Sequence, residues 1–443
     1  MTVSGRFVAL IAIGVVPLVL FGADSGTAML ILAGWVALAL AAGAIDLALA
    51  ASPRRVAIDR RVPGRVRMGA DALSELYVTN TGKRMLRGVV RDAWEPSAGA
   101  SPTRSSVSIP PGERRRVTTT LVPVRRGERR VEQVTVRAWG PLRLWARQAT
   151  LAAPGRIRVL PAFNARKHLP SRLARLRELD GMTSVMLRGQ GTEFDSLREY
   201  VRGDDVRSID WRATARRHDP SGGAGQRVMV RTWRPERDRR VIILIDTGRT
   251  AAARVDDEPR IDTAYESALL LEALATRAGD RVDVMAYDRR VRGRVQGASG
   301  PELLARTVDM MAGIDPELIE MDWAAVPAQV SSLTSQRALV VLLTSIDAPG
   351  ASHGLLSVLP QLTRKHTVVV ASVTDPESLR ATRQRDDRAT VYRAAAAERA
   401  LLDIARISAA IRRLGADVVT GAPADLPPAL SDHYLALKAA GRL

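Results

Sequence analysis

Two apolar stretches open the chain. Residues 7–22 contain no charged residue, and residues 26–50 contain only one, Asp46. At about 1.5 Å per residue, each stretch is long enough, or nearly so, to cross a hydrocarbon core of about 30 Å. The pattern predicts a transmembrane helical hairpin within residues 1–53. A cleaved signal peptide ending near Ala23 is the alternative, because such peptides begin in the same way.

Basic residues flank this hairpin at both ends. Arg6 precedes the first stretch and Arg54 and Arg55 follow the second, whereas the connection between the stretches contains Asp24 and no basic residue. The positive-inside rule then places both ends, and the rest of the chain, in the cytoplasm. Asp46 lies near the basic end of its stretch, where we expect it to reach the interface and pair with Arg54 or Arg55.

Residues 54–162 consist of short strand-like runs separated by turn signals. Runs such as residues 74–80 and 131–139 alternate or stay apolar at strand length, and Pro63-Gly64 and Pro110 to Gly112 are typical turn sequences. This pattern predicts an antiparallel, Ig-like β-sandwich of about seven strands. The stretch contains no His and only scattered acidic residues, so we expect no catalytic site in it.

From residue 241 to residue 443, apolar strands alternate with helical stretches, which predicts an α/β doubly wound domain with a parallel sheet covered on both faces. The predicted strands are residues 241–246, 281–287, 337–345, 366–373 and 416–420. The predicted helices lie around residues 261–277, 302–311, 354–364, 394–414 and 426–440. Ligands of such sheets bind beyond the carboxyl ends of the strands. Polar residues follow these ends at Asp246, residues 247–250, Asp288, Thr344, Ser345, Asp347, Thr374 and Asp375.

The composition narrows the chemistry that is available. The formal net charge is +19, almost entirely from Arg, which is typical of a biased genomic composition or of an anionic partner. The absence of Cys excludes disulfides, thiolate zinc sites and cysteine nucleophiles. The five His are dispersed, and no phosphate-binding loop occurs. Few aromatic residues are present, so we do not expect nucleic-acid binding; anionic lipids suit the basic residues 54–67 better.

The densest run of charges, residues 189–217, lies within the stretch of residues 163–240 that joins the two domains. We expect its opposite charges to form ion pairs between domains, and its apolar side chains to be buried. In this hypothesis Arg198, Arg207 and Arg216 pair with Glu193, Asp204, Asp205 and Asp210, while Phe194, Leu197, Tyr200, Ile209 and Trp211 form the buried side, with Trp211 packing the joint.

This stretch resembles the signature of the bacterial proteins called domain of unknown function 58. The matching positions are Glu193, Arg198, Glu199, Tyr200, Gly203, Asp204, Asp205, Arg207, Asp210, Trp211 and Arg216. The resemblance continues through residues 230–250, where the family places the start of a von Willebrand factor A-like domain. It implies a multi-pass protein of the bacterial inner membrane that works beside a MoxR-type AAA+ ATPase. The family has no established biochemical activity.

The resemblance also raises the question of Mg²⁺, which von Willebrand factor A domains hold through oxygen ligands from three loops. The candidate ligands here are Asp246, Thr250 and Asp347. Three positions depart from the family pattern: Gly248 lacks a hydroxyl, Met321 replaces a Thr, and Ser345 replaces an Asp. Arg249 would add a positive charge near the site. We therefore expect a degenerate site and no cofactor, with Mg²⁺ as the alternative.

Two functions remain open at this point. The first is a non-enzymatic, membrane-anchored adaptor whose sheet edge and residues 189–217 contact a protein partner. The alternative is a metal-dependent hydrolase that uses Asp204, Asp205 and Asp210, because two-metal sites need clustered carboxylates. The interleaved Arg residues and the lack of a nearby His for acid-base catalysis favour the adaptor.

Overall fold

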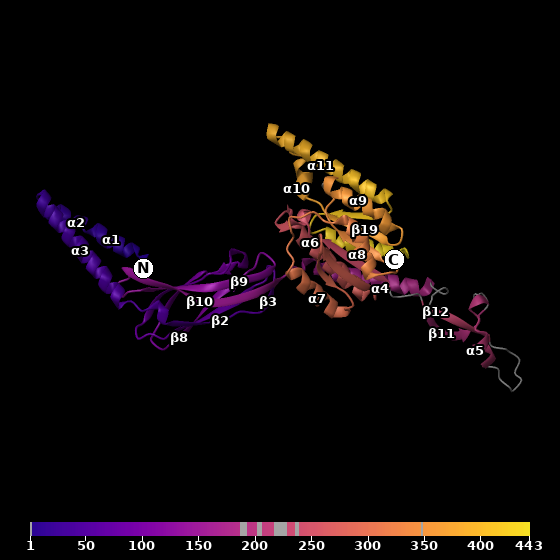
Figure 1. Cartoon of the computed structure of the whole chain (residues 1–443), viewed down its shortest axis with the longest axis horizontal. Coiled ribbons are helices and arrows are strands. Elements are labelled where there is room, and N and C mark those ends of the chain that lie inside the picture. Colours follow the sequence, from indigo (N-terminus) through magenta and orange to yellow (C-terminus); the bar gives the residue numbers. More distant parts are fainter. Residues whose placement is uncertain (1, 187–192, 202–205, 217–227, 235–238, 347–348) are drawn as a thin grey trace. The chain divides into compact units, whose positions relative to one another are not determined.

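A computed structural model describes residues 2–186, 193–201, 206–216, 228–234, 239–346 and 349–443. The chain divides into two compact units, residues 1–160 and residues 161–443. Figure 1 shows the helices and sheets of both units, and each unit is described below by itself.

Three apolar helices begin the first unit: α1 (Gly5–Ile13), α2 (Val15–Phe21) and α3 (Ser25–Leu49). Asp24 caps the start of α3 by accepting a hydrogen bond from the backbone amide of Thr27. Among the described residues, the helix that begins at Ser25 is the one long and apolar enough to cross a membrane, by length and composition. The first apolar stretch is divided at Gly14 into two short helices, so two equal spans are not supported.

The hairpin nevertheless packs on itself. Both short helices contact α3, and the indole nitrogen of Trp35 donates a hydrogen bond to the carbonyl oxygen of Leu10 at 2.9 Å. Gly14 lies directly against the Trp35 ring, where an added Cβ would come within 2.2 Å. This close approach explains why glycine occupies the point at which α1 gives way to α2.

The rest of the first unit contains two packed β-sheets. One has the order β1-β10-β9-β5-β7 with β3 beside β10, and the other has the order β2-β4-β8-β6. All ladders are antiparallel except that between β3 and β10. The strands are β1 (Thr2–Val3), β2 (Val56–Arg61), β3 (Arg65–Arg67), β4 (Ala72–Asn80), β5 (Leu86–Asp92), β6 (Ala100–Ser101), β7 (Arg104–Ile109), β8 (Arg114–Leu121), β9 (Gly127–Trp139) and β10 (Trp145–Leu160).

The two sheets bury alternate side chains, as a period of two requires. Along β4, fully buried residues such as Leu76 and Val78 alternate with partly exposed ones. The interior also holds an ion pair, Arg60 with Asp92 at 2.8 Å, and the indole nitrogen of Trp94 donates to the same carboxylate. Arg60 also donates to the carbonyl oxygen of Ala153 and thereby ties β2 to β10.

Asp46, near the end of α3, attaches this helix to the sandwich. Its carboxylate accepts hydrogen bonds from the backbone amides of Leu142 and Leu144, each at 2.7 Å, and of Trp145 at 3.1 Å. The side chain is almost fully buried. The expectation that Asp46 pairs with Arg54 or Arg55 is therefore wrong, because backbone amides of the loop before β10 supply its partners.

The second unit is built on a six-stranded sheet in the order β17-β16-β13-β18-β19-β20. All neighbours are parallel except β17, which runs antiparallel to β16 at one edge. The strands are β13 (Arg240–Asp246), β16 (Arg281–Tyr287), β17 (Val291–Val295), β18 (Leu339–Leu343), β19 (Thr367–Val373) and β20 (Asp417–Gly421). The edge strand β17 follows β16 in a tight hairpin and was not predicted from the sequence.

Helices cover both faces of this sheet. Side chains at alternate positions of β13, such as Ile242 and Leu244, form one core with α8, α9 and α11, while α6 and α12 pack on the other face. The helices are α6 (Arg260–Arg277), α7 (Gly300–Ala312), α8 (Val326–Leu333), α9 (Pro349–Thr363), α10 (Pro376–Ala381), α11 (Arg388–Arg413) and α12 (Leu426–Ala439). Doubly wound sheets of this order bind ligands beyond the carboxyl ends of their strands.

The segment before this sheet contains a helix and a small separate ladder. Helix α4 (Leu169–Met186) contacts α6 and α12, and Arg172 forms a salt bridge with Asp432 at 2.7 Å. Strands β11 (Glu193–Glu199) and β12 (Met229–Arg234) pair antiparallel, with α5 (Trp211–Arg216) contacting β12. We call the described residues 193–201, 206–216 and 228–234 the arm.

Candidate functional site

Asp246 ends β13, the central strand of the sheet in the second unit. Its side chain is buried, and three groups donate to its carboxylate: the amide of Gly248 at 2.8 Å, the Thr344 hydroxyl at 2.7 Å and the Thr250 hydroxyl at 3.3 Å. Burial raises the pKa of Asp246, although these hydrogen bonds counteract the shift. The Asp246 and Thr250 positions predicted from the sequence thus lie together, and Thr344, the residue after β18, joins them.

Asp288 follows the neighbouring strand β16 and forms a second buried carboxylate at this edge. It accepts hydrogen bonds from the Thr247 hydroxyl and the Arg292 guanidinium, each at 3.0 Å, and from the amides of Arg289 and Arg290. Although burial opposes ionisation, the amides and Arg292 together lower the pKa of Asp288. Asp288 is therefore a charged anchor that holds the loop after β13 through Thr247.

The loop after β13 has no room for the hydroxyl that Gly248 lacks. An added Cβ would lie 2.8 Å from the carbonyl oxygen of Ile319 and 3.1 Å from the Asp246 carboxylate. The backbone of residues 319–321 fills the space where a serine side chain would extend. Position 248 therefore lacks a hydroxyl ligand because the backbone of Gly248 packs closely against that of residues 319–321.

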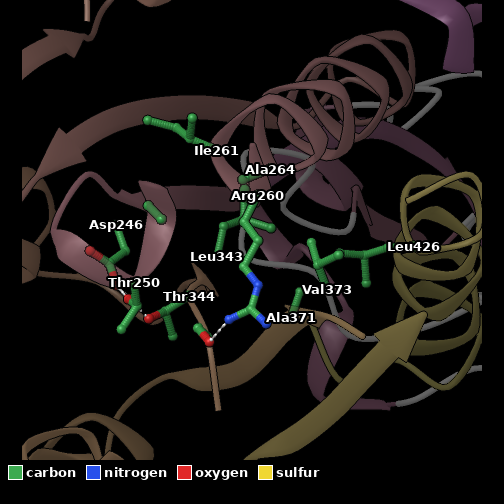
Figure 2. A pocket seen from close by; sticks show the side chains of 12 residues that line it. Asp246, Thr250, Arg260, Ile261, Ala264, Leu343, Thr344, Ala371, Val373 and Leu426 are labelled. Carbon is green, nitrogen blue, oxygen red and sulfur yellow. Dashed lines mark hydrogen bonds between the residues drawn. The ribbon is translucent and has the colours of Figure 1, made fainter. Parts of the chain in front are cut away.

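An arginine occupies the pocket beside Asp246. Figure 2 shows Arg260, the first residue of α6, reaching past Leu343 to donate a hydrogen bond to the Ser345 hydroxyl at 2.6 Å. The pocket has a volume of about 20 Å³, enough for roughly one water molecule. A guanidinium therefore lies where the sequence comparison suggested a third metal ligand. Sequence reasoning missed Arg260, since the start of a helix gave no sign that its side chain would turn toward the strand ends.

The described residues do not fit a Mg²⁺ site. Mg²⁺ requires near-octahedral oxygen ligation, whereas Asp246 is already engaged by three donors and Arg260 supplies a positive charge nearby. Within the described ranges, no group of three or more His, Asp or Glu side chains could hold a metal ion. Asp347, the third candidate ligand, lies outside the described residues. Arg249 does not point into the site, because its guanidinium pairs with Glu320 at 2.5 Å.

In the arm, Asp210 caps α5 and holds β12. Its carboxylate accepts hydrogen bonds from the amides of Arg212 and Ala213, each at 3.0 Å, and forms a salt bridge with Arg231 at 2.7 Å. The amide of Ala213 and the Arg231 guanidinium lower the pKa of Asp210. The described ionic partner of Asp210 is thus Arg231 of the partner strand, which the sequence hypothesis did not include, while the side chain of Arg216 lies outside the described residues.

Other predicted residues of the arm cannot be assigned in the same way. Gly203, Asp204 and Asp205 lie outside the described residues, and only the backbone of Glu193 and Arg216 is described. The side chains of Arg198, Glu199 and Arg207 are described, and one nitrogen of Arg198 donates to the carbonyl oxygen of Glu199. Because Asp210 is engaged in capping, the hydrolase hypothesis depends on Asp204 and Asp205.

Three of the five apolar side chains expected to be buried, Leu197, Tyr200 and Trp211, are exposed; Ile209 is partly buried, and the side chain of Phe194 lies outside the described residues. Trp211 is 66% exposed and Val206 is 65% exposed, while Leu197 and Tyr200 are 39% and 37% exposed. Trp211 is the first residue of a short helix that Asp210 caps. Trp211 therefore does not pack a joint, and the arm displays an apolar surface.

Comparisons with known proteins give one match to a family. The family described as "Protein of unknown function DUF58" matches residues 196–410, which supports the resemblance drawn from the signature residues. No curated protein matches the chain.

Several solved structures resemble part of the chain, at low identity. The CARDB domain of a protein from Pyrococcus furiosus is 21% identical and has a TM-score of 0.19, covering 24% of this chain and 91% of its own. A β-glucosidase from Listeria innocua is 15% identical, with a TM-score of 0.17, covering 24% of this chain and 16% of its own. A FixG-related protein from Vibrio parahaemolyticus is 10% identical, with a TM-score of 0.17, covering 24% of this chain and 96% of its own.

Proposed function

With the family match over residues 196–410 as the premise, we propose that this chain is a membrane-anchored, non-enzymatic adaptor. In this proposal the arm binds a protein partner, and the partner that the family resemblance suggests is a MoxR-type AAA+ ATPase. The sheet of the second unit is a von Willebrand factor A-like domain that works without a metal ion, because Arg260 stands in its pocket.

The exposed apolar side chains of the arm carry this proposal. Trp211, Val206 and Val201 are each more than half exposed, although large apolar side chains gain roughly 1.5–3 kcal/mol when they are fully buried. These three side chains lie within ten residues of one another in the sequence, and contiguous exposed apolar surface commonly marks a binding site. Trp is also the residue type most enriched among binding hot spots. The arm therefore has the composition of an interface rather than of a solvated ladder.

The membrane anchor rests on the helix that begins at Ser25, which has a mean hydropathy of 2.3 and is largely unburied. In this proposal α1 and α2 return beside α3 as the second arm of a hairpin, and the basic residues after α3 keep both units in the cytoplasm of a bacterial cell. Such an anchor would hold the arm near a membrane-associated complex.

The test is a cross-linked pull-down of the full-length protein from its own membranes. The variant Val206→Ser/Trp211→Ser removes the two large apolar side chains that are most exposed among the described residues of the arm. The matched control, Val391→Ser/Tyr392→Ser, removes two exposed apolar side chains of α11. We expect an AAA+ ATPase to be recovered with the wild type and the control, and to fall at least tenfold with the arm variant. Equal recovery with both variants would exclude the arm as the interface, and no ATPase with the wild type would end the adaptor proposal.

A further inference from the structure

A group of basic side chains surrounds the end of α3 in the first unit. The group, which we call the cationic collar, comprises Arg54, Arg55, Lys83, Arg84, Arg143 and Arg147. Arg147 is partly buried and the other five are exposed. The collar comes from three segments that are distant in sequence, so the fold rather than the local sequence brings it together.

Direct contacts fix the collar to the last turn of the helix. The Arg147 guanidinium donates to the carbonyl oxygen of Leu47 at 3.0 Å, and the Arg84 guanidinium donates to that of Ala48. The Thr81 hydroxyl and amide both donate to the carbonyl oxygen of Arg55, which places the loop carrying Lys83 and Arg84 beside the helix end. Positive charge at a helix C-terminus also complements the helix dipole.

The collar lacks the acidic partners that several other arginines of the sandwich have. Residues 47–58, 81–91 and 140–152 contain no Asp or Glu, and none of the six collar side chains forms a salt bridge within the described part of the chain. Arg114 and Arg116 on β8, by contrast, pair with Asp59 and Glu75 at 2.9 and 3.2 Å. The Asp46 carboxylate also lies at this end, but it is buried, hydrogen-bonded to the amides of Leu142, Leu144 and Trp145, and forms no salt bridge with a described basic side chain.

Two apolar side chains stand among the collar residues. Leu142 is 57% exposed and Met85 is 40% exposed, and each is adjacent in sequence to a collar arginine. The Leu142 amide is held by Asp46, so the Leu142 side chain lies at the end of the apolar helix. Basic residues interspersed with exposed apolar ones are typical of surfaces that bind the interfacial region of a membrane.

We propose that the cationic collar binds the headgroups of anionic phospholipids in the leaflet that surrounds the end of α3. This inference rests on the proposed membrane anchor and adds to it a lipid preference. Each basic side chain near an anionic membrane surface contributes about 1 kcal/mol, equivalent to about fivefold in binding. The collar thereby seats the sandwich on the membrane with Met85 and Leu142 at the interface.

The test compares spin-labelled phosphatidylglycerol and phosphatidylcholine around the full-length protein reconstituted into vesicles. Electron paramagnetic resonance gives the ratio of the two lipids immobilised by the protein. The variant Arg55→Gln/Lys83→Gln removes two exposed charges whose side chains form no hydrogen bond or ion pair with the described residues of α3. The control Arg130→Gln/Arg156→Gln removes the same charge from paired strands β9 and β10. Arg156 lies nine residues along β10 from Arg147, or about 30 Å away at about 3.3 Å per residue.

We expect the wild type and the control to prefer phosphatidylglycerol, and the collar variant to lose up to about fivefold of this preference for each charge removed. Salt at about 1 M, where the screening length is about 3 Å, should abolish the preference. A wild-type ratio of one, or equal loss in both variants, would overturn the proposal. Retention on the vesicles after an alkaline wash tests the anchor separately: a protein that stays bound but shows no lipid preference disproves the collar alone.

Discussion

Glu272 on α6 carries a buried carboxylate without a partner of opposite charge. It is 1% exposed, and among the described residues neither of its side-chain oxygens makes a hydrogen bond. Burial raises the pKa of Glu272 to about 7. The nearby Thr307 hydroxyl offsets part of this rise in pKa, although it does not reach hydrogen-bond geometry with the carboxylate. The folded second unit therefore retains a proton that the unfolded chain releases near pH 4.5.

This difference makes stability depend on pH in a defined direction. Because the folded state binds the proton more tightly, the contribution of Glu272 is fully present below about pH 4.5 and is lost as the pH rises to about 7. The pKa difference is 7 − 4.5, or about 2.5 units. Since one pKa unit corresponds to about 1.4 kcal/mol, the free energy of unfolding falls by about 3 kcal/mol. That is a large fraction of the 5–15 kcal/mol typical of a domain.

The variant Glu272→Gln keeps the shape of the side chain and removes its titration. We expect the free energy of unfolding of the wild type, relative to the variant, to fall by about 3 kcal/mol between pH 4.5 and pH 8. Urea-dependent hydrogen exchange of α6 peptides in the detergent-solubilised protein measures the unfolding of this unit without the sandwich. Subtracting the free energy of unfolding of the variant from that of the wild type at each pH removes the contribution of all other titrating groups.

The control is Glu302→Gln on α7, an exposed carboxylate that pairs with Arg306 at 2.6 Å. The difference in free energy of unfolding between Glu302→Gln and the wild type should change by less than about 1 kcal/mol over the same pH range, since exposed ion pairs contribute little to stability. If the wild type and Glu272→Gln show parallel pH profiles, then Glu272 is ionised in the folded unit and the reasoning from its burial is refuted.

Three further predictions follow from contacts described above, each measured by thermal unfolding with circular dichroism. Replacing Asp46 with Ala leaves three amides without their acceptor and should destabilise the first unit by about 3 kcal/mol; unchanged stability would mean that the helix and sandwich are held by other contacts. Breaking the buried pair by Arg60→Met should cost about 3–5 kcal/mol, because the Asp92 charge is left buried; a loss below about 1 kcal/mol would contradict this. Gly248→Ser should lower stability by about 1–3 kcal/mol through the clash with Ile319, and should produce no Mg²⁺ binding in calorimetry; Mg²⁺ binding would show that the loop adapts.

The sequence predicted the sheet of the second unit well because its strands are buried on both faces and read as unbroken apolar runs. The runs at residues 241–246 and 281–287 coincide with β13 and β16. The edge strand β17 has no such run, because Arg292 and Arg294 interrupt it. Hydrophobic patterning therefore locates central strands and says little about an edge that solvent can reach.

The polar contacts were harder to predict, because each depends on which segments fold together. Asp46 is bonded to amides almost a hundred residues away, and Arg260 reaches Ser345 across the sheet edge. For Trp211, the sequence indicated a residue to bury, whereas its side chain is 66% exposed at the start of α5. The resemblance to von Willebrand factor A domains identified Asp246 and Thr250 as neighbours, but not the guanidinium of Arg260 that lies beside them.

The attachment of Asp46 to the loop before β10 also has a mechanical consequence. A carboxylate held by three amides has little freedom to rotate, and Trp145 packs against Gly43 on the same helix, where an added Cβ would lie 2.6 Å from the indole ring. The helix and the sandwich thus lack a hinge between them. Bilayer thickness or a neighbouring subunit could tilt α3 or rotate it about its axis. The sandwich would then rotate with the helix as one rigid body.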